Sequence, residues 1–262
     1  SLNRSLREES ILIQSATLSS DTVEVVIAQN RFRSLPRAIG RVIRIVSALS
    51  PDSIKTIRVI PMNGDVELYA IEVSKENFDK LDNERISSPE LFNNSKVFSV
   101  DPYSYSRSDF KPTIRFPEFF LSMSPSLRHQ IGGPESFYLG QLWWKINAKV
   151  KFKRGLTLHT VLGLNIYNNF NEFNNPSYST IPHVRSDIQD YLSEGENNIA
   201  RFKIDYIWSP RKDLFVRLDL GYLEEMFGGV GGEVYYRPFK SNFSSSLQLH
   251  KVKQRGYRQR FD

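Results

Sequence analysis

Cysteine is absent from this 262-residue chain, which excludes disulfide bonds, thiolate metal sites and cysteine nucleophiles together. Long apolar segments are absent too, because none approaches the roughly 20 residues that a membrane-spanning helix needs. The strands of a membrane β-barrel cross without such a segment, so this absence leaves a membrane location open. The opening SLNRSLREESILIQSATL lacks the apolar core and cleavage site of a signal peptide, so we expect an exported protein to begin here in a mature or truncated form.

Residues in recognisable catalytic patterns are also scarce. The chain has no nucleophile elbow, phosphate loop or dinucleotide fingerprint, and metal-ligand spacing is missing from its four histidines, His129, His159, His183 and His250. The glycine-rich stretch from Phe227 to Val234 has no following helix, which favours a flexible hairpin over phosphate binding. We therefore expect no enzyme, no cofactor and no metal. The catalytic alternative is an outer-membrane hydrolase built on His159 or His250, which fall on polar strand faces.

Positive charge is in mild excess, with 35 Lys and Arg against 29 Asp and Glu, a net charge of +6 and a pI near 9.4. This balance suits an anionic partner. Nucleic acid is disfavoured, because the aromatic residues alternate away from the lysines instead of sharing a stacking face with them.

The pattern of residues 10–85 predicts a small α/β module. Its expected elements are a strand at 22–29, a helix from 34 to 51, strands at 54–60 and 66–73, and a short helix from Lys75. Ser34 can cap the helix and Pro51 ends it. The Asn-Gly pair within Met62 to Asp65 is typical of a tight hairpin.

Three arginines lie away from the apolar side of this helix, namely Arg37, Arg41 and Arg44. They form a weak candidate docking face for an acidic partner. The alternative is that they are only solvated, as basic residues on the wet side of an amphipathic helix usually are.

Residues 86–136 lack clear periodicity. They carry prolines among Asn, Ser and Tyr, at Pro89, Pro102, Pro112, Pro117, Pro125 and Pro134. This composition predicts an ordered but irregular connector.

Residues 137–262 show long alternating strands instead. In the first, hydrophobic residues from Trp144 to Phe152 alternate with Lys145, Asn147, Lys149, Lys151 and Lys153. Later strands place Arg201, Lys203 and Arg217 on their polar sides. We expect six strands joined by alternating short and longer loops, the longest running from Asn168 to Asn197.

Two architectures fit this alternation. A soluble antiparallel sheet has one side on a core and the other in water. In an outer-membrane barrel, strands of about 11 residues with a rise of roughly 3.3 Å, tilted near 45°, match an apolar band of about 25 Å. The lysines must then face water, because one lysine facing lipid at mid-depth costs roughly 2 to 4 kcal/mol. We favour the barrel, with Trp143 and Trp144 among the interfacial aromatic residues near strand ends.

The predicted fold class is therefore α+β. A small strand-helix-strand-strand module (10–85), periplasmic or plugging the barrel, precedes the connector (86–136) and antiparallel β-barrel strands of outer-membrane type (137–262). Known membrane barrels begin at about eight strands, so we expect an incomplete barrel and a fragment of a longer protein. The candidate polymer-guiding residues of the lumen are Lys145, Lys149, Lys151, Lys153, Arg201, Lys203 and Arg217.

Three long phrases carry a family resemblance. They are RSLPRAIGRVIRIVSALSPDSIKTIRVIPMNGDVELYAIEV, RHQIGGPESFYLGQLWWKINAKVKFKRGLTLHTVLGLNIYNNF and NPSYSTIPHVRSDIQDYLSEGENNIARFKIDYIWSPRKDLFVRLDLGYLEEMFGGVGGEVYYRPF. From about Arg31 onward the chain resembles the YjbH/GfcD family of Gram-negative outer-membrane proteins.

The resemblance implies a barrel surrounded by outer-membrane lipid and encoded with exopolysaccharide or group 4 capsule genes. It also implies a longer protein with a signal peptide and further strands, working with a small lipoprotein and periplasmic partners. It implies no catalytic residue set. We expect the basic lumen to guide an anionic polysaccharide during export or assembly. The alternative is a soluble or membrane-anchored binding module whose α/β domain recruits partners.

Overall fold

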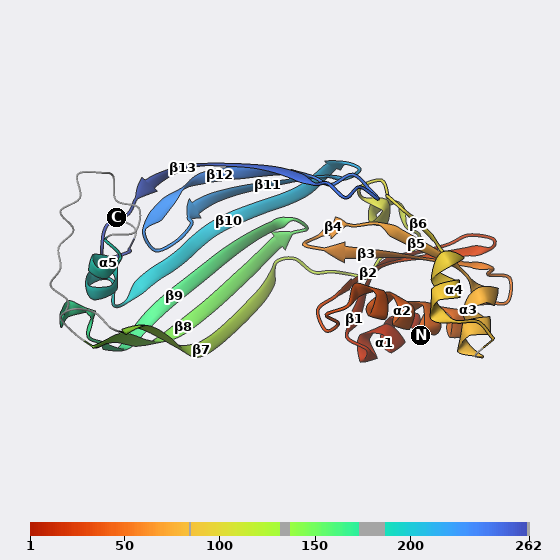
Figure 1. Cartoon of the computed structure of the whole chain (residues 1–262), viewed down its shortest axis with the longest axis horizontal. Coiled ribbons are helices and arrows are strands. Elements are labelled where there is room, and N and C mark those ends of the chain that lie inside the picture. The colour runs from red at the N-terminus through yellow and green to blue at the C-terminus, as the bar shows by residue number, and fades with distance from the viewer. Residues whose placement is uncertain (84, 132–136, 173–186, 261–262) are drawn as a thin grey trace. The chain divides into compact units, whose positions relative to one another are not determined.

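The computed structural model describes residues 1–83, 85–131, 137–172 and 187–260, which form two compact units (Figure 1). The first unit comprises 1–114, 208–216 and 235–245, and the second comprises 115–207, 217–234 and 246 onward. The chain contains helices and two β-sheets, in which the strands pair mostly antiparallel. The α+β class is thereby confirmed.

The first unit is a sheet covered by helices. Its elements are α1 (Leu2–Glu8), β1 (Ile11–Leu18), β2 (Thr22–Gln29), α2 (Leu35–Leu49), β3 (Thr56–Asn63), β4 (Val66–Glu67), β5 (Ala70–Ser74), α3 (Lys75–Asp82), α4 (Ser88–Asn93), β6 (Lys96–Phe98) and the 3₁₀ helix η1 (Ser104–Arg107). The sheet order is β1-β2-β3-β5-β6, with β4 paired to β3. The strands β2 and β3 pair in parallel, because α2 carries the chain back between them.

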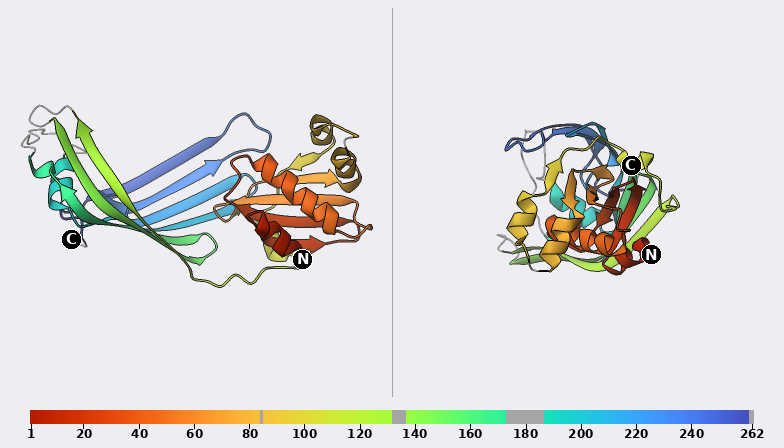
Figure 2. Two further views of the ribbon diagram at one scale, coloured as in Figure 1. Left: turned by 90° about the horizontal axis from the view of Figure 1, so that it is seen from below. Right: turned by 90° about the vertical axis from the view of Figure 1, so that its right-hand side faces the viewer.

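The helix α2 forms where the sequence predicts it. Ser34 is its N-cap, proline occupies the first turn and Ser50 ends it. Its apolar stripe is buried against the sheet, and the stripe consists of Ala38, Ile39, Val42, Ile43 and Val46. Figure 2 shows this helix lying along one side of the sheet.

Apolar residues are buried on both sides of the first sheet. The larger cluster joins α1, α2 and α3 to strand residues such as Val25 and Ile57. A smaller cluster on the other side contains Val26, Ile60 and Met62, with Phe98 packed against it. Neighbouring residues of one strand thus point into two different cores, as alternation along a strand requires.

The predicted hairpin is present, but the strand after it is divided. Gly64 and Asp65 form the turn with positive φ values of 57° and 68°. The predicted strand at 66–73 consists of the short β4 and the separate β5. The break lies where the Leu68 amide donates back to Pro61 and the Glu67 carboxylate bonds to η1.

The second sheet is a meander of seven strands, which Figure 1 shows side by side in chain order. Its elements are β7 (Glu118–Ile131), β8 (Tyr138–Lys153), β9 (Leu156–Asn168), β10 (Asn198–Arg211), β11 (Leu214–Tyr222), β12 (Phe227–Tyr236) and β13 (Ser245–Gln254), with η2 (Phe170–Glu172) and α5 (Ile188–Glu194) after β9. Among the described residues no pairing joins β7 to β13, so closure into a barrel is not shown. The helices described for this chain include none long and apolar enough to cross a membrane.

The strand β7 was not predicted, and it occupies 14 residues of the predicted irregular connector. Its side chains do alternate, with Phe119, Leu121 and Met123 on one side and serines on the other. This pattern was not interpreted as a strand, because Pro125 lies within it and proline is disfavoured inside strands. A proline is tolerated here because β7 is an edge strand of the described sheet.

The connections of the second sheet follow the predicted alternation only in part. Two-residue turns join β8 to β9 and β10 to β11, and Gly155 takes the positive φ of 77° that the first turn requires. A long connection separates β9 from β10. The glycine-rich stretch at 227–234 is part of β12 and not a hairpin, which corrects the prediction.

Candidate functional site

The two sides of the second sheet differ in chemistry. On one side, register aligns Met123 of β7 with Ile146 of β8, and Ile146 with Leu162 of β9. Large hydrophobic side chains on this side are exposed, for example Leu121 at 71% and Leu220 at 59%. Nothing in the described chain covers this apolar side, although a side of this size normally requires a cover.

The opposite, polar side carries most of the predicted cations. Register places Lys145, Lys149 and Lys151 on it, beside Ser124, Phe120 and Glu118 of β7. Lys149 also lies opposite His159 of β9, which in turn pairs with Lys203 of β10. The ammonium of Lys149 lies 5.8 Å from the centroid of the Phe120 ring.

Within the part of the chain that the structure describes, carboxylates pair with at least two of the predicted cations. Lys203 Nζ lies 2.8 Å from Asp205 Oδ1, and Arg217 Nη2 lies 3.0 Å from Glu233 Oε2. Asp205 is buried, so its pairing with Lys203 is the arrangement that burial of a charge demands. These acidic partners were not predicted, because alternation along a strand shows which residues share a side but not which carboxylates lie within reach of a cation.

Lys153 lies on the apolar side, which corrects its predicted place in the lumen. A bulge between Lys151 and Lys153 aligns Lys153 with Leu156, whose neighbour in β10 is Tyr206. The Lys153 ammonium lies 5.3 Å from the Tyr206 ring centroid. One extra residue in a strand reverses every side chain beyond it, and simple alternation cannot anticipate that.

The two histidines of the hydrolase alternative both pair with buried aspartates. His159 Nε2 is 3.3 Å from Asp205, and His250 Nε2 is 3.0 Å from Asp219. Within the described residues no serine hydroxyl hydrogen-bonds to either histidine, and no group of three potential metal ligands gathers there. Gly231 makes room for the second pair, because a Cβ at this glycine would lie 2.0 Å from His250 Cδ2.

At one end of the second sheet the polar side is concave. Arg128 of β7 forms an ion pair with Glu225 of the β11–β12 connection, although β8, β9 and β10 lie between them in the sheet. Arg128 also stacks over the Trp143 ring at 4.4 Å. The sheet must therefore curl toward its polar side to bring these residues together.

Trp143 corrects a second prediction. It is 4% exposed and belongs to the polar side, whereas Trp144 is 43% exposed on the apolar side. Gly163 allows this packing, because a Cβ there would lie 2.8 Å from the Trp143 ring. The alternation along β8 indicated opposite sides for the two tryptophans. Both were nevertheless assigned to the interfacial aromatic residues, because both lie near a strand end.

The C-terminal segment after β13 secures the concave end. The buried Arg255 guanidinium donates to the carbonyl oxygens of Ile199 and Glu224, both at 2.9 Å. The main-chain carbonyl oxygen of Arg255 accepts a hydrogen bond from the Tyr191 hydroxyl of α5. Burial raises the pKa of Tyr191, so this phenol remains a donor at neutral pH.

The arginines of α2 are only partly available for docking. Arg41 Nη1 lies 3.2 Å from Glu9 Oε1, within the first unit. Arg37 and Arg44 are exposed. The docking hypothesis for this helix stays a prediction.

The first sheet carries its own row of charges across neighbouring strands. Arg58 of β3 lies between Glu24 of β2 and Glu72 of β5, at 3.0 Å and 2.8 Å. Burial alone would lower the pKa of Arg58, but hydrogen bonds to the two carboxylates outweigh burial and raise that pKa above its ordinary value. Lys96 of β6 extends the row at 3.7 Å from Glu72.

Fold and site define a two-unit α+β protein whose second sheet is apolar on one side and charged on the other. The family described as "Exopolysaccharide biosynthesis protein YbjH" (YjbH) matches residues 1–262. The chain belongs to this family, as the sequence resemblance predicted.

One curated relative is the "Uncharacterized lipoprotein YjbH" of Escherichia coli (strain K12), which is 30% identical over 242 residues. The alignment covers 91% of this chain and 34% of the relative, so the chain spans about a third of that protein. No solved structure matches the chain.

Proposed function

We propose that the second sheet forms part of an outer-membrane β-barrel that guides an anionic exopolysaccharide during export or assembly. The apolar side contacts lipid, and the polar side borders a water-filled passage. The observation that carries this proposal is the uncovered apolar side, which runs from Leu121 of β7 to Leu249 of β13, both about 70% exposed (71% and 69%).

The exposed side chains argue against the soluble-sheet alternative. In a soluble sheet with one covered side, hydrophobic residues of the alternating strands would be buried and the lysines exposed. Here Leu218 is 48% exposed while Asp219, the next residue of β11, is 4% exposed. This inversion suits a protein whose surroundings are apolar and whose concave side is wet.

The charged groups that support polymer contact are Lys145, Lys149, Lys151 and Arg201. Lys203 and Arg217 retain a smaller part, because their carboxylate partners cancel much of their field. A passage with a moderate cationic excess can attract an anionic polymer without holding it too tightly for movement.

The family and the relative's name support the proposed location in the cell envelope and the proposed partners. That relative is called a lipoprotein, which supports a membrane-associated place in the cell envelope for this chain too. The family description supports an exopolysaccharide context. We further propose a guiding role without catalysis, in which a lipoprotein and periplasmic proteins assist.

Charge reversal on the polar side tests the guiding role. In cells making the Lys149→Glu, Lys151→Glu double variant, secreted anionic polymer should fall several-fold, because two attractive charges become repulsive. Secreted uronate measures export, and heat-modifiable gel mobility in outer-membrane fractions measures folded protein.

The matched control reverses two exposed cations of the first unit, Arg33→Glu with Lys55→Glu, and should leave export unchanged. Normal export by the Lys149, Lys151 variant, with equal protein in the membrane, would reject the guiding role.

A second candidate assigns recognition to the first unit and leaves the second sheet as an anchor. The exposed Arg37 and Arg44 on α2 favour it. Replacing both by glutamate would then abolish export as fully as loss of the protein does. Unchanged export would return the function to the second sheet.

A further inference from the structure

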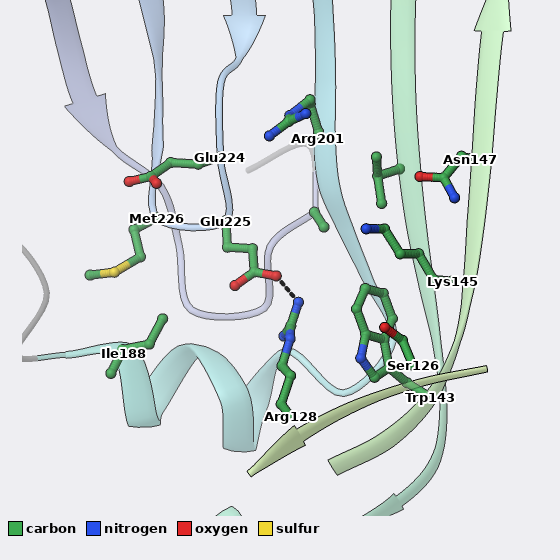
Figure 3. A pocket seen from close by; sticks show the side chains of 12 residues that line it. Ser126, Arg128, Trp143, Lys145, Asn147, Ile188, Arg201, Glu224, Glu225 and Met226 are labelled. Atoms are coloured by element: carbon green, nitrogen blue, oxygen red, sulfur yellow. Dashed lines mark hydrogen bonds and ion pairs between the residues drawn. The ribbon is translucent and has the colours of Figure 1, made fainter. Parts of the chain in front are cut away.

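A cavity of about 380 Å³ lies at the concave end of the polar side (Figure 3). Side chains of the second unit line it from β7, β8, β9, β10, α5 and the β11–β12 connection. Its polar lining includes Ser126, Arg128, Lys145, Asn147, Arg201 and Glu225. Its volume is in the range of sites for small ligands, which begins at roughly 300 Å³.

One wall of this cavity is already satisfied by its own contacts. Arg128 stacks on Trp143 and pairs with Glu225, and its Nη1 lies 3.4 Å from the Gln141 side-chain oxygen. These contacts fix the wall before any ligand arrives. A prearranged wall lowers the entropy cost of binding.

The other wall presents donors with unused capacity. Among the described residues, no carboxylate or other side chain pairs with Lys145, and the Asn147 and Ser126 side chains have no hydrogen-bond partner. In the described part of the chain, Arg201 donates one hydrogen bond, from Nε to the Leu223 carbonyl oxygen at 3.3 Å. Figure 3 shows Lys145 and Arg201 beside the same space as Glu225.

Trp143 adds a buried donor without a partner. Its Nε1 has no hydrogen-bond partner among the described residues, although the residue is 4% exposed and lines the cavity. A buried indole N–H normally finds an acceptor. A ligand hydroxyl or carboxylate oxygen in the cavity would supply one.

We propose that this cavity binds a single carboxylate-bearing sugar residue. Lys145 and Arg201 bind the carboxylate, since neither cation has a carboxylate partner among the residues that the structure describes and Arg201 can offer two parallel N–H groups. Asn147 and Ser126 bind ring hydroxyls. This inference rests on the proposed function and deepens it: the passage holds a discrete uronate-binding subsite in addition to a diffuse positive field.

Calorimetric titration of the purified, detergent-solubilised protein with digalacturonate tests the subsite, with maltose as the neutral probe. Digalacturonate should bind saturably and maltose at least tenfold more weakly. Lys145→Gln and Arg201→Gln should each weaken digalacturonate binding about tenfold, because each removes a charge-assisted contact. Trp143→Phe keeps an aromatic ring against Arg128 and should weaken binding several-fold.

Lys253→Gln is the matched control, because it removes an exposed positive charge from the same unit outside the cavity, and the affinity for digalacturonate should be unchanged. Should Lys145→Gln fail to fold, Lys145→Arg and Asn147→Leu replace it, with binding expected to be kept and lost respectively. Equal binding of the two sugars, or undiminished binding by the Lys145 and Arg201 variants, would overturn the subsite.

The two proposals fail in different ways. Absent uronate binding together with export that still depends on Lys149 and Lys151 removes only the subsite. Uronate binding that requires Lys145, with export indifferent to Lys149 and Lys151, removes the guiding role and leaves a binding site. Digalacturonate that binds equally well to all four variants identifies a site elsewhere on the molecule and overturns the subsite.

Discussion

The two sheets of this protein use their apolar residues in opposite ways. In the first, Ile57 is fully buried under helices and Ile60 is buried in the smaller cluster on the other side. In the second, Leu218 and Leu220 are about half exposed, at 48% and 59%, while the acidic Asp219 between them is buried. Strands with similar alternation thus serve a self-contained core in one unit and an outward apolar surface in the other.

This difference shows that alternation specifies two unlike sides but not the surroundings of either side. Helices that cover a sheet must come from the same chain or a partner, and the first unit supplies its own. The second sheet requires a cover that the described chain does not contain, which is the physical basis for proposing lipid.

The largest expected effect concerns the core of the first unit. Ile57→Ala should lower the free energy of unfolding of that unit by about 2 to 5 kcal/mol, because it leaves a cavity among packed side chains. Hydrogen exchange of amides in β2 and β3 measures it. Leu218→Ala on the apolar side of the second sheet is the comparison and should change stability by less than about 0.5 kcal/mol. An equal cost at both positions would show that protein covers Leu218.

Adjacent residues of β7 test the two sides of the second sheet directly. Met123 lies on the apolar side and Ser122 on the polar side, and both are exposed. If lipid covers the apolar side, Met123→Lys should cost about 2 to 4 kcal/mol near mid-depth and Ser122→Lys almost nothing. The amount of heat-modifiable protein in outer-membrane vesicles measures both. Equal tolerance of the two lysines would place both sides in water.

Weakening the hydrogen bonds between β4 and η1 should have a smaller effect on stability. The buried Glu67 carboxylate accepts hydrogen bonds from the Ser104 amide and hydroxyl and from the Tyr105 amide, at 2.9, 2.6 and 2.9 Å. Glu67→Gln removes the charge that strengthens them and should cost about 1.5 to 3 kcal/mol. Faster hydrogen exchange at the Ser104 and Tyr105 amides, with an unchanged second unit, is the expected result. Unaltered exchange would contradict the assigned role of Glu67.

The smallest expected effect on stability comes from loss of the hydrogen bonds at the N-terminus of α4. The Ser87 amide and hydroxyl donate to Glu90, and these hydrogen bonds lower the pKa of the Glu90 carboxyl. A lowered folded-state pKa means that the stabilisation is present above the unfolded-state pKa and lost as pH falls through the folded-state value. Exchange at the Ser87 amide, measured relative to its intrinsic rate at the same pH, should therefore accelerate below about pH 4, near the ordinary glutamate pKa. In Glu90→Gln this acceleration should disappear, and its persistence would assign the change to another carboxyl.

Local features could be predicted where the pattern is strong and uninterrupted. The helix α2 has a regular apolar stripe with a cap and a proline at its ends, and β2 matches the predicted bounds of 22–29. The alternation of β8 correctly separated Lys145, Lys149 and Lys151 from their apolar neighbours. These outcomes depend on residues close in sequence.

Other features depend on distant residues and could not be predicted in this way. The pairing of Arg128 with Glu225 joins positions 97 residues apart. The neutralisation of Arg217 by Glu233 requires the register of β11 against β12. The side of Lys153 depends on a bulge, which one extra residue creates without a sequence signal that alternation can detect.

The sequence by itself determined that the second half forms long strands with one polar and one apolar side, because side-chain direction alternates with every residue of a strand. Only the tertiary structure decided that carboxylates pair with Lys203 and Arg217 and that Trp143, Lys145 and Arg201 surround one cavity. The physical reason is that neighbours across strands are set by register, bulges and curvature, and these arise from the pairing of the whole sheet and not from any short stretch of it.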